Sequence, residues 1–113
     1  MARSHNKVAD GLADLTMDQA RSWKRDYNIC QDPLKANWII QTDGGRRSEN
    51  CAAAALVVGI WALDEGTLHY EPWFAQCTFL TGGATVFQTE AIALDTAVRW
   101  CKKKVEILQQ ESG

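Results

Sequence analysis

The chain has 113 residues, of which 46% are hydrophobic and 23% charged, and its net charge is −2. This length and composition predict one globular domain over residues 1–113 with a substantial core. No apolar run approaches the ~20 residues that span a bilayer, and the N-terminus lacks the apolar segment of a secretory signal. Because the net charge is slightly negative, a nucleic-acid partner would need a local basic patch or bound cations.

The first predicted element is a helix over residues 7–23, within a helical N-terminal unit at 5–23. Its apolar residues share one broad face, and Asn6 is a suitable N-cap. Gly11 inside this helix costs about 1 kcal/mol relative to alanine. Residues 24–37 contain no clear period and are predicted to be a linker.

The rest of the chain, 38–113, is predicted to contain the remaining strands and one further helix. Strands are expected at 37–43, 51–63, 67–80 and 105–112, and a helix at 86–101. Pro72 within the third of these strands indicates either an edge position or a bulge. The order of helix, three strands, helix and strand is typical of an α/β or α+β domain.

The four cysteines, Cys30, Cys51, Cys77 and Cys101, are widely spaced and include no CxxC pair. This pattern favours reduced, mostly buried thiols over a zinc site or a disulfide framework. The expected location is therefore intracellular, in the reducing cytoplasm or nucleus.

A carboxylate on the face that the helix at 86–101 should bury is the most informative feature. Glu90 lies near the middle of the apolar arc of this helix, between Ala97 and Cys101 on a helical wheel. A buried carboxylate is paired, protonated or bound to a metal. Taken alone, each acid has a simpler explanation: an ion pair for Glu90, a turn for Asp43 and helix-dipole compensation for Asp10.

Three segments together resemble the ribonuclease H family. "WIIQTDGG" is similar to the end of that family's first strand, "TVFQTEAIALDTAV" to its first helix, and "HNKVADGLADLTMD" to its last helix. The resemblance implies an α/β, ribonuclease H-like mixed sheet of three antiparallel strands, a helix and a parallel fourth strand, with the family's last helix placed first. It also implies that Asp43, Glu90 and Asp10 bind metal, with Glu111 replacing the fourth acid of the family.

The order of the motifs departs from the family, because the motif that ends the family's domain begins this chain. The chain is then either a circularly permuted, minimal domain or a junction between two such domains. In both cases the fourth strand lacks a neighbour, so a homodimer that completes the sheet at this strand is plausible. Val86 and Phe87 occupy positions that are amide-rich in the family. Substrate contacts are expected from Asn6, Gly44, Gly45, Arg46, Thr85 and Gln88.

The function that the resemblance implies is a metal-dependent endonuclease acting on the RNA strand of RNA–DNA hybrids. The clustered carboxylates would hold two Mg²⁺ or Mn²⁺ ions, which suit oxygen ligands and catalyse in-line displacement at a phosphodiester. Asp43 would bridge the two ions, Glu90 would hold one ion and its water, and Asp10 and Glu111 would complete the shells. Two alternatives are a catalytically inactive ribonuclease H-like module that binds nucleic acid or protein, and a structural domain whose acids are coincidental.

Overall fold

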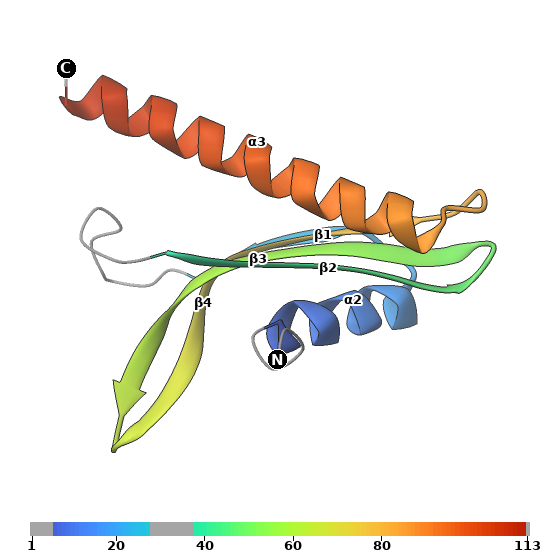
Figure 1. Cartoon of the computed structure of the whole chain (residues 1–113), viewed down its shortest axis with the longest axis horizontal. Coiled ribbons are helices and arrows are strands. Elements are labelled where there is room, and N and C mark those ends of the chain that lie inside the picture. The colour runs from blue at the N-terminus through green and yellow to red at the C-terminus, as the bar shows by residue number, and fades with distance from the viewer. Residues whose placement is uncertain (1–5, 28–37, 113) are drawn as a thin grey trace.

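Two helices cover opposite faces of a four-stranded antiparallel sheet in the computed structural model, which describes residues 6–27 and 38–112 (Figure 1). The elements in chain order are α2 (Lys7–Gln19), β1 (Trp23–Asp26), β2 (Ile39–Ser48), β3 (Cys51–Asp64), β4 (Thr67–Leu80) and α3 (Val86–Ser112). The strands lie in the order β1-β4-β3-β2, and all neighbours are antiparallel. The predicted α/β class is confirmed at this level, whereas the predicted parallel strand is absent from the described sheet.

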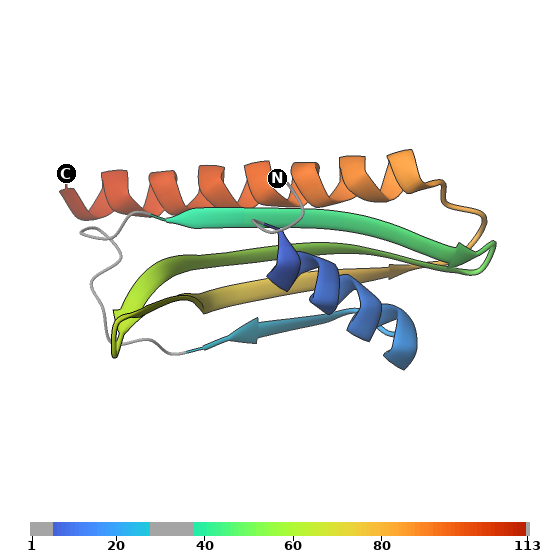
Figure 2. The same ribbon diagram turned by 60° about the horizontal axis from the view of Figure 1, so that its bottom comes forward.

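The central strand β3 shows why a run of small and aliphatic residues forms the core. Ala53, Ala55 and Val57 are buried on the side of α2, whereas Leu56 and Val58 are buried on the side of α3. Successive residues of a strand point to opposite faces, so a strand covered on both faces can be apolar throughout. Figure 2 shows β3 and β4 inside the sheet and α2 lying across one face.

Pro72 lies at an irregularity of β4. Val58 pairs with Phe74 whereas Gly59 pairs with Pro72, which leaves Trp73 as an extra residue in β4. The predicted bulge at Pro72 is confirmed. Strand β4 lies between β1 and β3, but β1 pairs only with Phe74 to Cys77, so within the described residues Pro72 has a paired strand on one side only. A bulge tolerates proline since it interrupts the regular ladder of hydrogen bonds.

The N-terminal helix is shorter than predicted. It ends at Gln19, because Ala20 adopts a left-handed conformation with φ of 53° and donates its N–H to the carbonyl of Thr16. Trp23 then starts β1 and pairs with Cys77 of β4, so the predicted linker at 24–37 begins as a strand. The indole of Trp23 donates to the hydroxyl of Thr16 over 2.9 Å, which ties this strand to the helix. Residues 28–37 of the linker lie outside the described residues.

The predicted fourth strand at 105–112 is wrong, because these residues continue α3 to Ser112. The segment after Lys102 consists mainly of good helix formers, Lys, Glu, Leu and Gln, and contains no glycine or proline to stop the helix. At 27 residues the helix is about 40 Å long. None of the described helices is long and apolar enough to cross a membrane. A dimer that completes the sheet through residues 105–112 has no strand there to use.

The three cysteines among the described residues are free thiols. Cys77 is buried, and Cys51 and Cys101 are half-buried. Burial raises the pKa of the Cys77 thiol above its ordinary value, which disfavours the reactive thiolate. Cys30 lies outside the described residues.

Candidate metal centre

The N-terminus of α2 is attached to the middle of β2 by two amide side chains. Asn6 Nδ2 donates to the carbonyl of Thr42 over 2.6 Å, and Gln41 Oε1 accepts the backbone N–H of Ala9 over 3.2 Å. Gln41 is buried, and it satisfies an amide that has no partner within the helix. Asn6 occupies the predicted N-cap position, but its side chain bonds to the strand and does not cap the helix. These contacts hold Asp10 in the first turn of α2 beside Asp43.

The N-terminus of α3 approaches the same part of β2 at Gly44. A Cβ atom at Gly44 would lie 2.6 Å from the backbone nitrogen of Glu90 and 2.7 Å from the carbonyl carbon of Thr89. Because these neighbours are backbone atoms, only glycine allows this approach of helix to strand. The side chain of Thr89 is fully buried at the contact. Asp43 directly precedes Gly44 in the chain, so the close approach at Gly44 also brings Glu90 near Asp43.

The three acids interact electrostatically at Asp43. The pKa of Asp43 is raised from 3.8 to about 6. The largest cause is burial, followed by a hydrogen bond with the Asp10 side chain and then by the charge of Asp10. The charge of Glu90 raises it further, and the backbone N–H of Gly44 acts in the opposite direction. Like charges that share a site disfavour ionisation. Asp10 therefore contacts Asp43, whereas Glu90 acts on Asp43 only through its charge, which is the smallest of these effects.

The arrangement is open and does not form a closed coordination shell. Among residues 6–27 and 38–112, no group of three or more His, Cys, Asp or Glu side chains is close enough to hold a metal ion as it stands. Asp43 is half-buried within β2, whereas Asp10 is exposed in the first turn of α2. Glu90 is exposed just after the first turn of α3, so the expectation that it lies on the buried face of this helix is wrong. Their oxygen donors match the preference of Mg²⁺ and Mn²⁺, and mutual repulsion keeps free carboxylates apart. A cation would need Glu90 to turn toward the Asp10–Asp43 pair.

Glu111 does not join this cluster within one chain. It lies in the last turn of α3, 21 residues after Glu90. At a rise of 1.5 Å per residue the two positions are about 31 Å apart along the helix. The expectation that Glu111 supplies a fourth ligand rested on a strand at 105–112, and it is wrong because that segment is helical.

The two glycines expected to contact substrate face the helices. Gly44 packs on α3, and a Cβ at Gly45 would lie 3.2 Å from the methyl group of Met17 in α2. Both positions serve the packing of helices on β2. Asn6, also expected at the substrate, donates its amide to the backbone of Thr42.

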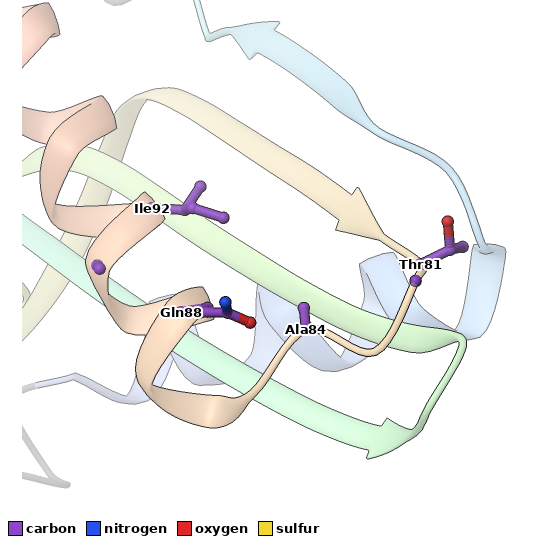
Figure 3. A pocket seen from close by; sticks show the side chains of 6 residues that line it. Thr81, Ala84, Gln88 and Ile92 are labelled. Carbon is purple, nitrogen blue, oxygen red and sulfur yellow. The ribbon is translucent and has the colours of Figure 1, made fainter.

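Thr85 and Gln88 form a reciprocal cap at the start of α3. Thr85 Oγ1 accepts the N–H of Gln88 over 3.1 Å, and Gln88 Oε1 accepts the N–H of Thr85 over 2.8 Å. The spacing T-x-x-Q before a helix is the signature of this capping box, so the sequence already carried the signal for this structural role. Gln88 also lines an open depression of about 400 Å³ beside α3 (Figure 3). The other lining residues are Thr81, Gly82, Ala84, Ala91 and Ile92.

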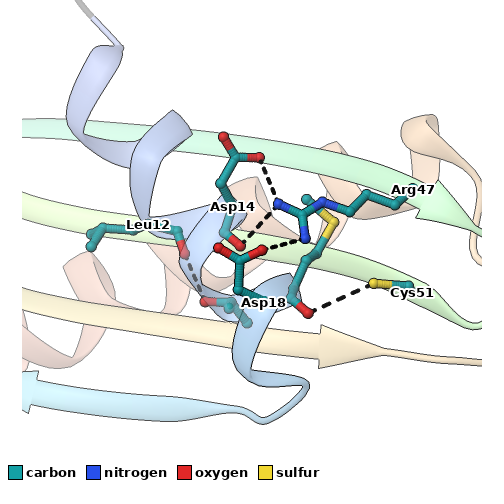
Figure 4. A network of polar contacts seen from close by, with 7 residues as sticks. Leu12, Asp14, Asp18, Arg47 and Cys51 are labelled. Atoms are coloured by element: carbon teal, nitrogen blue, oxygen red, sulfur yellow. Dashed lines mark hydrogen bonds and ion pairs between the residues drawn. The ribbon is translucent and has the colours of Figure 1, made fainter.

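The two arginines at the end of β2 differ in their contacts. Arg47 bonds Asp18 over 2.5 Å and lies 3.7 Å from the carboxylate of Asp14, which links β2 to α2 (Figure 4). The hydrogen bond with Asp18, followed by the charges of Asp18 and Asp14, keeps the pKa of Arg47 above its ordinary value. Arg46 is exposed, and among the described residues its side chain makes no ion pair or hydrogen bond, whereas Arg47 is held by α2. Arg46 is thus the better placed of the two for a phosphate contact.

Comparison with known proteins finds no family model, no curated protein and no solved structure that matches this chain at a significant level.

The raised pKa of Asp43 predicts a pH-dependent stability. Because the folded-state value of about 6 exceeds the unfolded value near 3.8, the fold favours the protonated acid. This contribution to the free energy of unfolding is fully present below pH 3.8 and is lost as the pH rises through about 6. Carboxyl-detected NMR titration should give an Asp43 midpoint near 6, and Asp10→Asn should lower it. An Asp43 midpoint near 4, unchanged in Asp10→Asn, would contradict the interaction between these acids.

Proposed function

We propose that the chain is a divalent-metal-dependent endonuclease that cleaves the RNA strand of RNA–DNA hybrids. The observation that carries the proposal is the contact of Asp10 with Asp43, with Glu90 near enough for its charge to act on Asp43, together with the raised pKa of Asp43. Acids arranged so that they repel one another cost stability, and a cation site is the function that such an arrangement serves best.

The sequence resemblance gives this site its proposed reaction. Strands β2, β3 and β4 with α3 would correspond to the first three strands and first helix of the ribonuclease H family, and α2 to its last helix. The packing of α2 and α3 on opposite faces of β2, with one acid from each beside Asp43, supports this correspondence.

Each acid has a role that follows from its position. Asp43, fixed on β2, would be the central ligand, and Asp10 and Glu90 would complete the metal site from the two helices. Divalent ions such as Mg²⁺ or Mn²⁺ would supply an activated water and stabilise the leaving oxygen of a phosphodiester. Arg46 would contact a backbone phosphate and Gln88, at the rim of the depression, the sugar-phosphate backbone of the hybrid. The bound cations would offset the negative charge of the protein toward this polyanion.

A cleavage assay on a labelled RNA–DNA hybrid with Mg²⁺ or Mn²⁺ tests the proposal. Asp43→Asn should reduce the cleavage rate at least about a hundredfold, because metal stabilisation of the transition state amounts to several kcal/mol. Asp14→Asn, one turn after Asp10 on the same helix and exposed, is the matched control and should retain activity. Equal rates for the two variants would overturn the assignment of the site.

The second candidate is a ribonuclease H-like module that binds nucleic acid or protein without cleavage. It is favoured by Val86 and Phe87, which are exposed before the helix glutamate and cannot donate a hydrogen bond to a sugar or base. Binding of the hybrid by the wild-type chain without cleavage at any Mg²⁺ or Mn²⁺ concentration would favour this function over the nuclease.

A further inference from the structure

Helix α3 carries a second apolar surface that points away from the sheet. Its residues, called here the α3 stripe, are Phe87, Ala91, Leu94, Val98, Cys101 and Val105. Phe87 is 85% exposed, Leu94 58% and Val98 64%. The face that α3 buries on the sheet is a different one, formed around Thr89, Ala93 and Ala97.

The spacing of the α3 stripe is that of a coiled-coil seam. Its members follow one another at intervals of four, three, four, three and four residues, which is the heptad pattern of a helix that packs along another helix. Single exposed apolar residues are ordinary, but a continuous seam of this kind marks an interaction surface. Leu94 and Val98 lie at its centre, and the smaller Ala91 and Cys101 lie on either side of them.

We propose that the α3 stripe binds the α3 stripe of a second copy of this chain in antiparallel orientation. Antiparallel alignment about residue 96 places Phe87 opposite Val105 of the second copy, and Leu94 opposite Val98 of the second copy. Ala91 then faces Cys101 of the second copy, so two small side chains meet and the helices can approach to the usual 8–10 Å. Every position of the seam finds an apolar partner in this alignment.

The charges along α3 select the antiparallel orientation. The first half of the helix carries only the acids Glu90 and Asp95. The second half is net positive, because Arg99 and the run Lys102, Lys103 and Lys104 outnumber the two acids Glu106 and Glu111. Arg99 already pairs with Asp95 over 2.9 Å. A parallel pair would bring the two lysine runs together, whereas an antiparallel pair places each run beside the acidic half of the other helix. Like charges are thereby separated and opposite charges brought together.

The position of α3 in the fold leaves this contact accessible. The helix packs on β2, which is one edge of the sheet, and within the described residues no strand lies beyond β2. Figure 1 shows α3 as the outermost layer on its side of the sheet, with α2 on the other. The inference goes beyond the proposed nuclease activity and does not rest on it.

Sedimentation equilibrium of the full chain tests the dimer. The wild-type chain should dimerise, and Leu94→Glu should raise the dissociation constant at least about a hundredfold, because it places a charge in the centre of an apolar seam. Leu68→Glu is a matched control: Leu68 is 60% exposed, close to the 58% of Leu94, but it lies on β4. This control should leave the dissociation constant unchanged. A monomeric wild-type chain, or equal effects of the two substitutions with both variants folded, would overturn the proposal.

Cysteine crosslinking tests the orientation. In the antiparallel dimer Ala91→Cys places a new thiol opposite Cys101 of the second copy, so oxidised glutathione should link residues 91 and 101 between chains. In the wild-type protein Cys101 faces Ala91 of the second copy and should form no such link. Peptide mass spectrometry identifies the linked residues. A Cys101–Cys101 link in the wild-type dimer would show a parallel pair and contradict the proposed orientation.

Discussion

Gly44→Ala is expected to destabilise the fold by about 3 kcal/mol or more. The new methyl group would overlap the backbone of Thr89 and Glu90, which cannot rotate away as a side chain can. The chain must therefore move α3 off β2 at the contact that positions Glu90. Urea unfolding followed by circular dichroism should show a lower midpoint with a similar m value.

Gly11→Ala is the matched control for this substitution. A Cβ at Gly11 would have no described atom within 4 Å outside its own helix and its chain neighbours, and the position is exposed in the interior of α2. Alanine should therefore stabilise the protein by about 0.5–1 kcal/mol, since it lowers the entropy of the unfolded chain. If the two glycine variants had similar stability, the close approach of α3 to β2 at Gly44 would be contradicted.

Asp43→Asn is expected to raise the melting temperature of the metal-free protein at pH 7 by roughly 3–6 °C. Asparagine keeps the shape of the side chain and removes a charge that lies beside Asp10 and Glu90. We expect a gain of about 1 kcal/mol, well below the full effect of the pKa shift, because solvent screens these partly exposed acids. The measurement is a thermal melt in the presence of a chelator.

With divalent cations, the wild-type chain should have a higher melting temperature than Asp43→Asn. A ligand that binds only the folded state at a hundred times its dissociation constant stabilises by about 2.7 kcal/mol. Mg²⁺ or Mn²⁺ should therefore raise the melting temperature of the wild-type chain and leave that of Asp43→Asn nearly unchanged. Asp14→Asn should behave as the wild type in both conditions. A lower melting temperature of Asp43→Asn in chelator would show that its charge is stabilising and would argue against a cation site.

Much of the secondary structure was predictable because the local signals are strong. Turn residues delimit β3 and β4, and their predicted bounds at 51–63 and 67–80 agree with the structure within a residue. The start of α3 at Val86 was also predictable. Asp10, Asp43 and Glu90 were selected from separate motifs, but two of the reasons differ from the structure. Glu90 is exposed and does not lie on the buried face of α3, and Asp43 lies within β2, which continues to Ser48.

What the sequence alone determined, then, is which residue types each segment offers: apolar strands, amphipathic helices, and acids at Asp10, Asp43 and Glu90. Only the tertiary structure decided where these segments meet. Helix α2 ends at Gln19 and Trp23 pairs with β4 of the sheet. The side chains of Asn6 and Gln41 attach α2 to β2 by hydrogen bonds. Residues 105–112 continue α3 as a helix, so Glu111 lies far along this helix from Glu90. The physical reason is that caps, edge pairing and close backbone approach depend on partners distant in the chain, which no local period encodes.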